Sequence, residues 1–218
     1  MSSPRIIPGG LFVSFEGPEC AGKSTQSQRL ETSLRDQGYR VLRTREPGGT
    51  EVGEQLRHIV KHVCGEEAVC DEAELLIFCA SRAQLMRKVI LPFLEEGGVV
   101  ICDRFADSTT AYQGAGRGFS SDTLAPLHEM ATTGRWPDVT FLLDLDVDIV
   151  LQRGQMRLET LFVQDRIEEE SKRFHETVRQ AFLQLAEANA DRFRVLDARL
   201  DRDDLEKQIM SNVTPFLS

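Results

Sequence analysis

Short apolar runs alternate with longer stretches of mixed polarity along almost the whole chain. Each run has the length and the aliphatic character of a buried β-strand. The third run is apolar throughout, as expected for a central strand of a parallel sheet. The runs lie at residues 11–15, 39–44, 99–102, 139–143 and 193–196.

The stretches between these runs have helical patterns. Helices are expected from residue 24 to Gly38, and at residues 50–62, 71–94, 108–113, 121–133, 165–188 and 201–212. The helix at 71–94 is apolar on most of its sides, which predicts that it is largely buried. Strands that alternate with helices predict an α/β fold, a parallel sheet with helices on both faces.

The first strand leads directly into a phosphate-binding loop, Gly17-x-x-x-x-Gly22-Lys23-Ser24, and a helix follows. Glycines allow successive backbone N–H groups to face phosphate oxygens, and the helix N-terminus adds its positive end. Lys23 would bring a charge to the terminal phosphates, and the Ser24 hydroxyl could ligate Mg²⁺. The motif predicts an ATP site formed by Gly17, Pro18, Glu19, Cys20, Ala21, Gly22, Lys23, Ser24 and Thr25.

Charged residues also follow three other strands of the predicted sheet. Arg45 follows the second, Asp103 and Arg104 follow the third, and Asp144 follows the fourth. In a doubly wound sheet, ligands bind outside the carboxyl ends of the strands. Asp103 is therefore a candidate to hold Mg²⁺ together with Ser24, although a carboxylate there could also cap a turn. The two arginines suit phosphate oxygens, and Asp144 is left without an assignment.

Composition narrows the class of protein. The chain of 218 residues is long enough for one domain, residues 11–218, behind a short flexible leader, residues 1–10. A net charge of -9 argues against a nucleic-acid partner. Five scattered cysteines without a C-x-x-C spacing predict free thiols, and no apolar stretch is long enough for a membrane span or a signal peptide. We therefore expect a cytoplasmic protein.

Several further segments, taken in order, resemble the thymidylate kinases, in particular the bacterial type. They are residues 15–25 (FEGPECAGKST), 44–50 (TREPGGT), 75–84 (LLIFCASRAQ), 103–105 (DRF), 108–114 (STTAYQG), 137–144 (PDVTFLLD) and 165–168 (DRIE). The resemblance implies a P-loop NTPase-type sheet of five parallel strands with a small lid, at about residues 153–166. It also implies a homodimer that uses ATP and Mg²⁺ to convert dTMP to dTDP for dTTP synthesis.

The resemblance also implies roles for the residues around the acceptor nucleotide. Arg45 and Arg104 would bind the dTMP phosphate, and Glu19 would contact the acceptor sugar or the surroundings of its phosphate from inside the loop. Phe78 would stack on the thymine and Arg82 would donate to a ring carbonyl. The remaining contacts would be Ser108 and Gln113 in the base pocket, and Tyr112 against the sugar, where it would exclude a ribose hydroxyl.

The chain departs from the resemblance in the phosphate-binding loop and in the lid. Some members of the family carry an arginine within the loop, where this chain has Cys20. In the branch without that arginine, lid arginines stabilise the transferring phosphoryl group. Here the candidates are Arg153 and Arg157, with Arg166 as a third, and the family pattern favours Arg153. The implied catalytic set is thus Lys23, Asp103, Arg104, Arg153 and Arg157.

Two alternatives remain open at this stage. One is a related P-loop kinase that phosphorylates another (deoxy)nucleoside or nucleoside monophosphate. The other is a GTPase-type switch, but such proteins recognise guanine through an N/T-K-x-D segment, which this sequence lacks.

Overall fold

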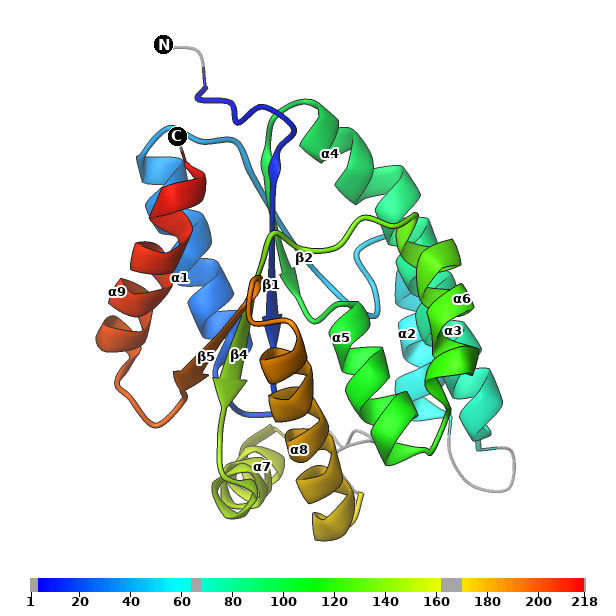
Figure 1. Ribbon diagram of the computed structural model, residues 1–218. Coiled ribbons are helices and arrows are strands. Elements are labelled where there is room, and N and C mark those ends of the chain that lie inside the picture. Colours follow the sequence, from blue (N-terminus) through cyan, green and yellow to red (C-terminus); the bar gives the residue numbers. More distant parts are fainter. Residues whose placement is uncertain (1–3, 64–67, 162–169, 218) are drawn as a thin grey trace.

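Five parallel strands form a single sheet in the order β2-β3-β1-β4-β5 (Figure 1). The computed structural model describes residues 4–63, 68–161 and 170–217. The sequence predicts all five strands, with boundaries that differ by one or two residues. The strands are β1 (Leu11–Glu16), β2 (Val41–Arg45), β3 (Val99–Asp103), β4 (Val139–Asp144) and β5 (Phe193–Asp197).

Helices connect successive strands and cover both faces of the sheet. Pairing β1 with both β3 and β4 places the loop that follows β1 at the centre of the sheet edge. The helices are α1 (Lys23–Asp36), α2 (Glu51–His62), α3 (Asp71–Leu85), α4 (Leu91–Glu95), α5 (Ala106–Thr109), α6 (Ser121–Thr132), α7 (Val147–Leu161), α8 (Lys172–Ala188) and α9 (Arg202–Val213). Shorter helical segments are η2 (Met86–Ile90), η3 (Thr110–Gly116) and η4 (Thr214–Phe216).

Successive side chains of β1 point to opposite faces of the sheet, so the hydrophobic core has a part on each face. Val13 and Phe15 belong to the cluster on the face that α1 and α9 cover. Phe12 points to the opposite face and packs with residues of η2, such as Ile90, and of α4. Further along that second face, α8 packs Phe182 against β4 and β5. Both faces are therefore buried, which explains why the central strands lack polar alternation.

The helix expected at residues 71–94 is one continuous helical stretch, but it is less buried than its composition predicts. It consists of α3, η2 and α4, and its middle is π-helical. α3 lies in an outer layer between α2 and α6, so one side stays open and Leu76 is 56 % exposed. The prediction of a largely buried helix is therefore wrong for this side of α3.

The described part of the leader packs against the end of the sheet opposite the strand carboxyl ends (Figure 1). Arg5 N–H donates to the Gly38 carbonyl at 2.9 Å, and Ile7 N–H donates to the Gly97 carbonyl at 2.9 Å. Ile7 itself is buried in the core. Within the described ranges, no helix has the length and apolar character that crossing a membrane requires.

Candidate active site

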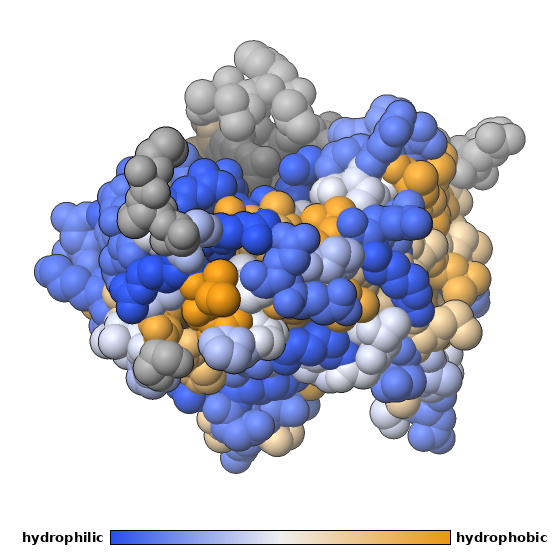
Figure 2. All heavy atoms as spheres, turned by 90° about the horizontal axis from the view of Figure 1, so that it is seen from above, coloured by the Kyte–Doolittle hydropathy of each residue, from blue (hydrophilic) through white to orange (hydrophobic). Residues whose placement is uncertain are grey.

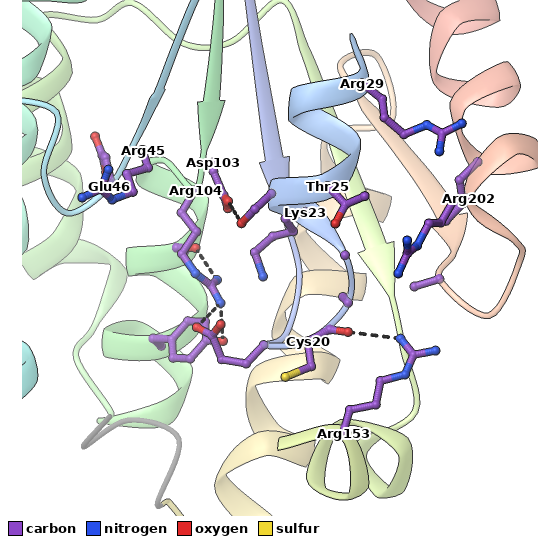
Figure 3. Close-up of a pocket in the computed structure, with 18 of the residues that line it drawn as sticks. Cys20, Lys23, Thr25, Arg29, Arg45, Glu46, Asp103, Arg104, Arg153 and Arg202 are labelled. Atoms are coloured by element: carbon purple, nitrogen blue, oxygen red, sulfur yellow. Dashed lines mark hydrogen bonds and ion pairs between the residues drawn. The ribbon is translucent and has the colours of Figure 1, made fainter. Parts of the chain in front are cut away.

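A cavity of about 1140 Å³ opens at the carboxyl ends of the strands (Figure 3). Its walls come from the loop after β1, the ends of β2 and β3, helices α2, α3 and α7, and the segment after β5. Although the chain is acidic overall, many cationic residues line this cavity. They are Lys23, Arg29, Arg45, Arg57, Lys61, Arg104, Arg153, Arg202 and Lys207. Such a concentration of positive charge favours a polyanionic ligand.

The loop after β1 has the backbone geometry of a phosphate-binding loop. Gly17 has φ 124°, and a Cβ at this position would collide with the Leu143 carbonyl oxygen of β4. Only glycine fits so close to the neighbouring strand. Gly22 then precedes α1 in the left-handed region, φ 94°, which turns the N-terminus of α1 toward the cavity. An anion here meets both free N–H groups and the helix dipole.

Lys23 is almost completely buried beneath the loop. Its Nζ donates to the Pro18 carbonyl at 2.6 Å and to the Gly17 carbonyl at 3.1 Å. Burial lowers the pKa of Lys23, with Arg104 adding to the effect and Glu19 opposing it. The ammonium group is therefore held inside the loop, where the terminal phosphates of a nucleotide would replace weak carbonyl contacts with charged ones.

Ser24 and Asp103 form the pair expected from the sequence. Ser24 Oγ donates to Asp103 Oδ2 at 2.5 Å, so a hydroxyl and a carboxylate lie side by side at the cavity wall. Mg²⁺ prefers hard oxygen ligands and is often held by one carboxylate together with phosphate oxygens and water. These two residues fit that donor set.

Arg104 is the most connected residue of the cavity. Its Nη1 donates to the Gly17 carbonyl and to Ser108 Oγ, both at 3.0 Å. Its Nη2 donates to Glu19 Oε1 at 2.6 Å and to the Tyr112 hydroxyl at 3.2 Å. One guanidinium thus joins the phosphate-binding loop to α5 and η3, and four other predicted site residues contact it directly.

The charges around Arg104 stabilise each other. Burial alone would raise the pKa of Glu19, but Arg104, together with Lys23, holds it well below its usual range. Burial also raises the pKa of the Tyr112 hydroxyl to about 12. Glu19 is therefore ionised and Tyr112 neutral at physiological pH.

The wall predicted for the acceptor base contains Phe78, which lines the cavity from α3. Arg82, one helical turn further on, is only 1 % exposed and lies behind this wall. It pairs with Glu46 at 2.7 Å, and its Nη2 also donates to Thr109 Oγ1 at 2.9 Å. Its Nη1 has no hydrogen-bond partner among the described residues. A buried N–H group without a partner is costly. Arg82 itself is not among the described residues that line the cavity.

Ser108, Tyr112 and Gln113 line the same side of the cavity, as the sequence predicts. The Tyr112 ring packs between Phe174 and Phe182 of α8. Arg45 lies at the edge of the cavity, where it is half exposed and pairs with Glu54 at 2.8 Å.

Of the two arginines proposed from the predicted lid, Arg153 lies in the described part of the site. It projects from α7, and its Nη1 donates to the Cys20 carbonyl at 3.1 Å (Figure 3). This brings a cation to the rim of the phosphate-binding loop. The side chain of Arg157, residues 162–166 of the predicted lid and the start of the helix expected at 165–188 lie outside the described residues.

Sequence reasoning missed the wall that follows β5. Ala198, Leu200 and the start of α9 line the cavity. In Figure 3, Arg202 and Arg29 lie on the opposite side of Lys23 from Arg45 and Glu46. Applying the strand-end argument to the fifth strand as well would have found this segment. Asp144, which has no assignment from the sequence, accepts from Arg179 Nε at 2.8 Å and from Arg179 Nη2 at 2.9 Å, an ion pair that gives it a structural role.

Glu16 is a second residue that the sequence analysis did not identify. It is fully buried at the end of β1, where Oε1 accepts from Phe105 N–H at 2.7 Å and Oε2 contacts Ser108 Oγ at 2.5 Å. Arg104 directly precedes Phe105 and has φ 69°, a strained value for a residue with a side chain. Glu16 thus fixes Phe105, the residue after Arg104, and also Ser108, which accepts a hydrogen bond from Arg104.

A loop of this kind at the end of a central strand, facing arginines that leave the adjacent strand, is typical of P-loop kinases. The sequence model described as thymidylate kinase matches residues 15–209. A thymidylate kinase from Deinococcus radiodurans is 48 % identical over 94 % of this chain and 97 % of its own length. One from Thermomicrobium roseum is 43 % identical over 94 % and 95 %. A crystal structure of thymidylate kinase from Ehrlichia chaffeensis superimposes with a TM-score of 0.75 at 31 % identity, covering 94 % of this chain and 99 % of that one.

The chain therefore belongs to the thymidylate kinase family and is a phosphotransferase. This confirms the fold class and the family that the ordered motifs indicate. The GTPase-type alternative is not favoured.

Glu16 provides a test of the electrostatics beneath the site. Burial raises its pKa from the usual 4.5 to about 8, and Asp107 adds to this. At pH values between 4.5 and about 8, Glu16 keeps a proton in the folded protein that it has lost in the unfolded chain. The free energy of unfolding therefore falls as pH rises, by up to about 1.4 kcal/mol per pH unit from this group.

The variant Glu16→Gln cannot titrate, so its stability relative to the wild type should increase between pH 5 and pH 8. Urea denaturation of both proteins at pH 5, 6, 7 and 8 measures the difference. A difference that stays constant over this range would show that Glu16 titrates normally.

Proposed function

We propose that this protein transfers the γ-phosphate of ATP to dTMP and produces dTDP and ADP. The observation that carries the proposal is the arrangement of one cavity. A phosphate-binding loop with a buried lysine lies at its centre, and an aromatic and arginine-lined wall that suits a planar base lies on one side. The relatives named above are thymidylate kinases, which supports dTMP as the acceptor.

The chemistry follows from the placement of charge. A nucleoside monophosphate already carries a nucleophilic oxyanion at neutral pH, so its attack on the γ-phosphorus needs no strong base. One P–O bond forms at the acceptor phosphate, and the bond between the γ-phosphorus and the β–γ bridging oxygen breaks. The chain must mainly hold two anions together in line, and Lys23, Arg45 and Arg104 offset their repulsion.

We further propose that Ser24 and Asp103 hold Mg²⁺, whose charge neutralises the phosphates of ATP when it is bound. Among the described residues there is no group of three or more His, Cys, Asp or Glu side chains suited to a metal. A site of one hydroxyl and one carboxylate that relies on nucleotide phosphates fits Mg²⁺ rather than a metal held by protein ligands alone.

The acceptor is tested by a coupled assay of ADP formation with ATP, Mg²⁺ and a panel of acceptors: dTMP, dUMP, dCMP, dAMP, dGMP, CMP and thymidine. We expect the highest kcat/KM with dTMP and the loss of turnover with excess chelator. A higher kcat/KM for a purine nucleotide, for CMP or for the nucleoside would support the alternative of a related kinase with another acceptor.

We assign the stabilisation of the transferring phosphoryl group to Arg153. The loop lacks its own arginine, and Arg153 already reaches the Cys20 carbonyl from α7. Arg153→Ala should lower kcat by about two orders of magnitude or more, with little change in the KM of dTMP.

The comparison with Arg157→Ala decides between the two arginines proposed from the sequence. The exposed Arg173 on α8 supplies a control, and Arg173→Ala should retain wild-type kcat. If Arg157→Ala loses activity while Arg153→Ala keeps it, the assignment to Arg153 is wrong.

We also propose that two copies of the chain associate through α2, α3 and α6. These adjacent helices carry four exposed apolar side chains, with exposed fractions between 39 and 69 %: Val52, Ile59, Leu76 and Met130. Figure 2 shows apolar side chains along the side of the molecule where Figure 1 places these helices. Exposed apolar side chains on neighbouring elements are typical of a protein interface. The cytoplasmic location remains a prediction from the sequence.

Leu76→Glu should shift the protein from dimer to monomer, because a charge would be buried in the interface without a partner. Val195→Glu is a matched control, since Val195 is 50 % exposed on β5, away from these helices. Sedimentation equilibrium gives the mass of each variant. A monomeric wild type, or a dimer that survives Leu76→Glu, would contradict the proposed interface.

A further inference from the structure

The amide of Gln113 is held by a buried carboxylate that belongs to another helix. Gln113 lies in η3, is 2 % exposed and lines the cavity on the side of Phe78 and Tyr112. Its Nε2 donates to Glu74 Oε1 at 2.8 Å. Glu74 is on α3, one helical turn before Phe78, and is itself 1 % exposed. The contact is thus sealed from solvent at the wall of the acceptor side.

Glu74 also accepts hydrogen bonds from a second partner, Arg117. Arg117 Nε donates to Glu74 Oε1 at 3.3 Å, and Arg117 Nη2 donates to Oε2 at 3.4 Å. An arginine does not lose its charge in proteins and can only donate, so Arg117 is a permanent donor to both oxygens of Glu74. The Arg117 guanidinium also lies over the Phe174 ring, 4.8 Å from its centre, which restricts its position.

This arrangement fixes which way the amide faces. Both Glu74 oxygens accept from Arg117, and Oε1 also accepts from Gln113 Nε2, so Gln113 turns its NH₂ group toward Glu74. The carbonyl oxygen, on the other arm of the amide, is then the acceptor that Gln113 can offer to a ligand in the cavity. If Glu74 were neutral or absent, the amide could adopt either orientation.

The orientation matters because pyrimidine bases differ at N3. Thymine and uracil carry an N3–H donor, whereas N3 of cytosine is an acceptor. A fixed Gln113 carbonyl can accept from the N3–H of thymine or uracil. Against cytosine it would face the N3 acceptor, and two buried acceptors facing each other are both left without a donor. We propose that Glu74 is a positioning residue that makes the site select N3–H pyrimidines by fixing the amide of Gln113. This inference rests on the proposed dTMP kinase activity.

Glu170 supplies a matched control within the same network. It contacts Arg117 Nη1 at 2.5 Å, so it is part of the same ion-pair cluster. The described structure places its contact on Arg117 and not on Gln113. Replacing Glu170 removes one carboxylate from the cluster but leaves the carboxylate that orients the amide.

The test uses Glu74→Gln, which keeps the shape of the side chain but can present either a donor or an acceptor to Gln113. Values of kcat/KM are measured for dTMP, dUMP and dCMP with saturating ATP and Mg²⁺. We expect the dTMP/dCMP ratio to fall at least tenfold relative to the wild type. The dTMP/dUMP ratio should stay within twofold, because both bases carry N3–H. Glu170→Gln should keep both ratios.

A loss of kcat/KM that is equal for all three nucleotides would show that Glu74 is merely structural and would overturn the proposal. If Glu74→Gln does not fold, Gln113→Met removes the acceptor directly and should lower the dTMP/dCMP ratio by a similar factor; an unchanged ratio overturns the proposal as well. A wild type without preference for dTMP over dCMP would overturn the proposed activity itself, which distinguishes the two failures.

Discussion

The position of the Arg104 guanidinium is the constraint on which the rest of the site depends. Four hydrogen bonds tie it to the phosphate-binding loop and to η3, and the backbone that carries it is in the left-handed region. Such a backbone persists only where its surroundings determine it. Here Arg104 N–H donates to the Phe15 carbonyl at 2.9 Å, and Glu16 holds the next residue. The end of β1 therefore shapes both the phosphate-binding loop and the position of Arg104, the arginine proposed for the acceptor phosphate.

Charge in this molecule is distributed so that an acidic chain can hold anions. Several arginines of low exposure already have a carboxylate partner, as in the pairs Arg82–Glu46 and Arg104–Glu19. A buried ion pair adds little net stability, because desolvation offsets its attraction. Its contribution here is to hold each guanidinium in one orientation before a ligand arrives. A preorganised site avoids the cost of ordering these side chains during binding.

The sequence was sufficient to predict the elements that depend on local pattern. The spacing of Gly17, Gly22, Lys23 and Ser24 defines a loop, and apolar runs define the strands. Because parallel strands end at one edge, the residues after β2 and β3 could be assigned to one site. Glu16 and Glu74 could not, since their importance comes from partners 89 and 39 residues away in sequence. Leu76 shows a related limit: an apolar side chain on a helix is the same in sequence whether the protein core or another surface covers it.

The strand order has a consequence for how such an enzyme can change. The loop after β1 lies at the middle of the sheet, with β2 and β3 on one side and β4 and β5 on the other. The residues proposed for the acceptor lie on one side of this division, between Arg45 and Gln113, and the remaining walls come from Arg29, Arg153 and the segment after β5. The two sides of the cavity are thus built from different stretches of the chain. Evolution can alter the preference for one nucleotide while the contacts to the other remain intact.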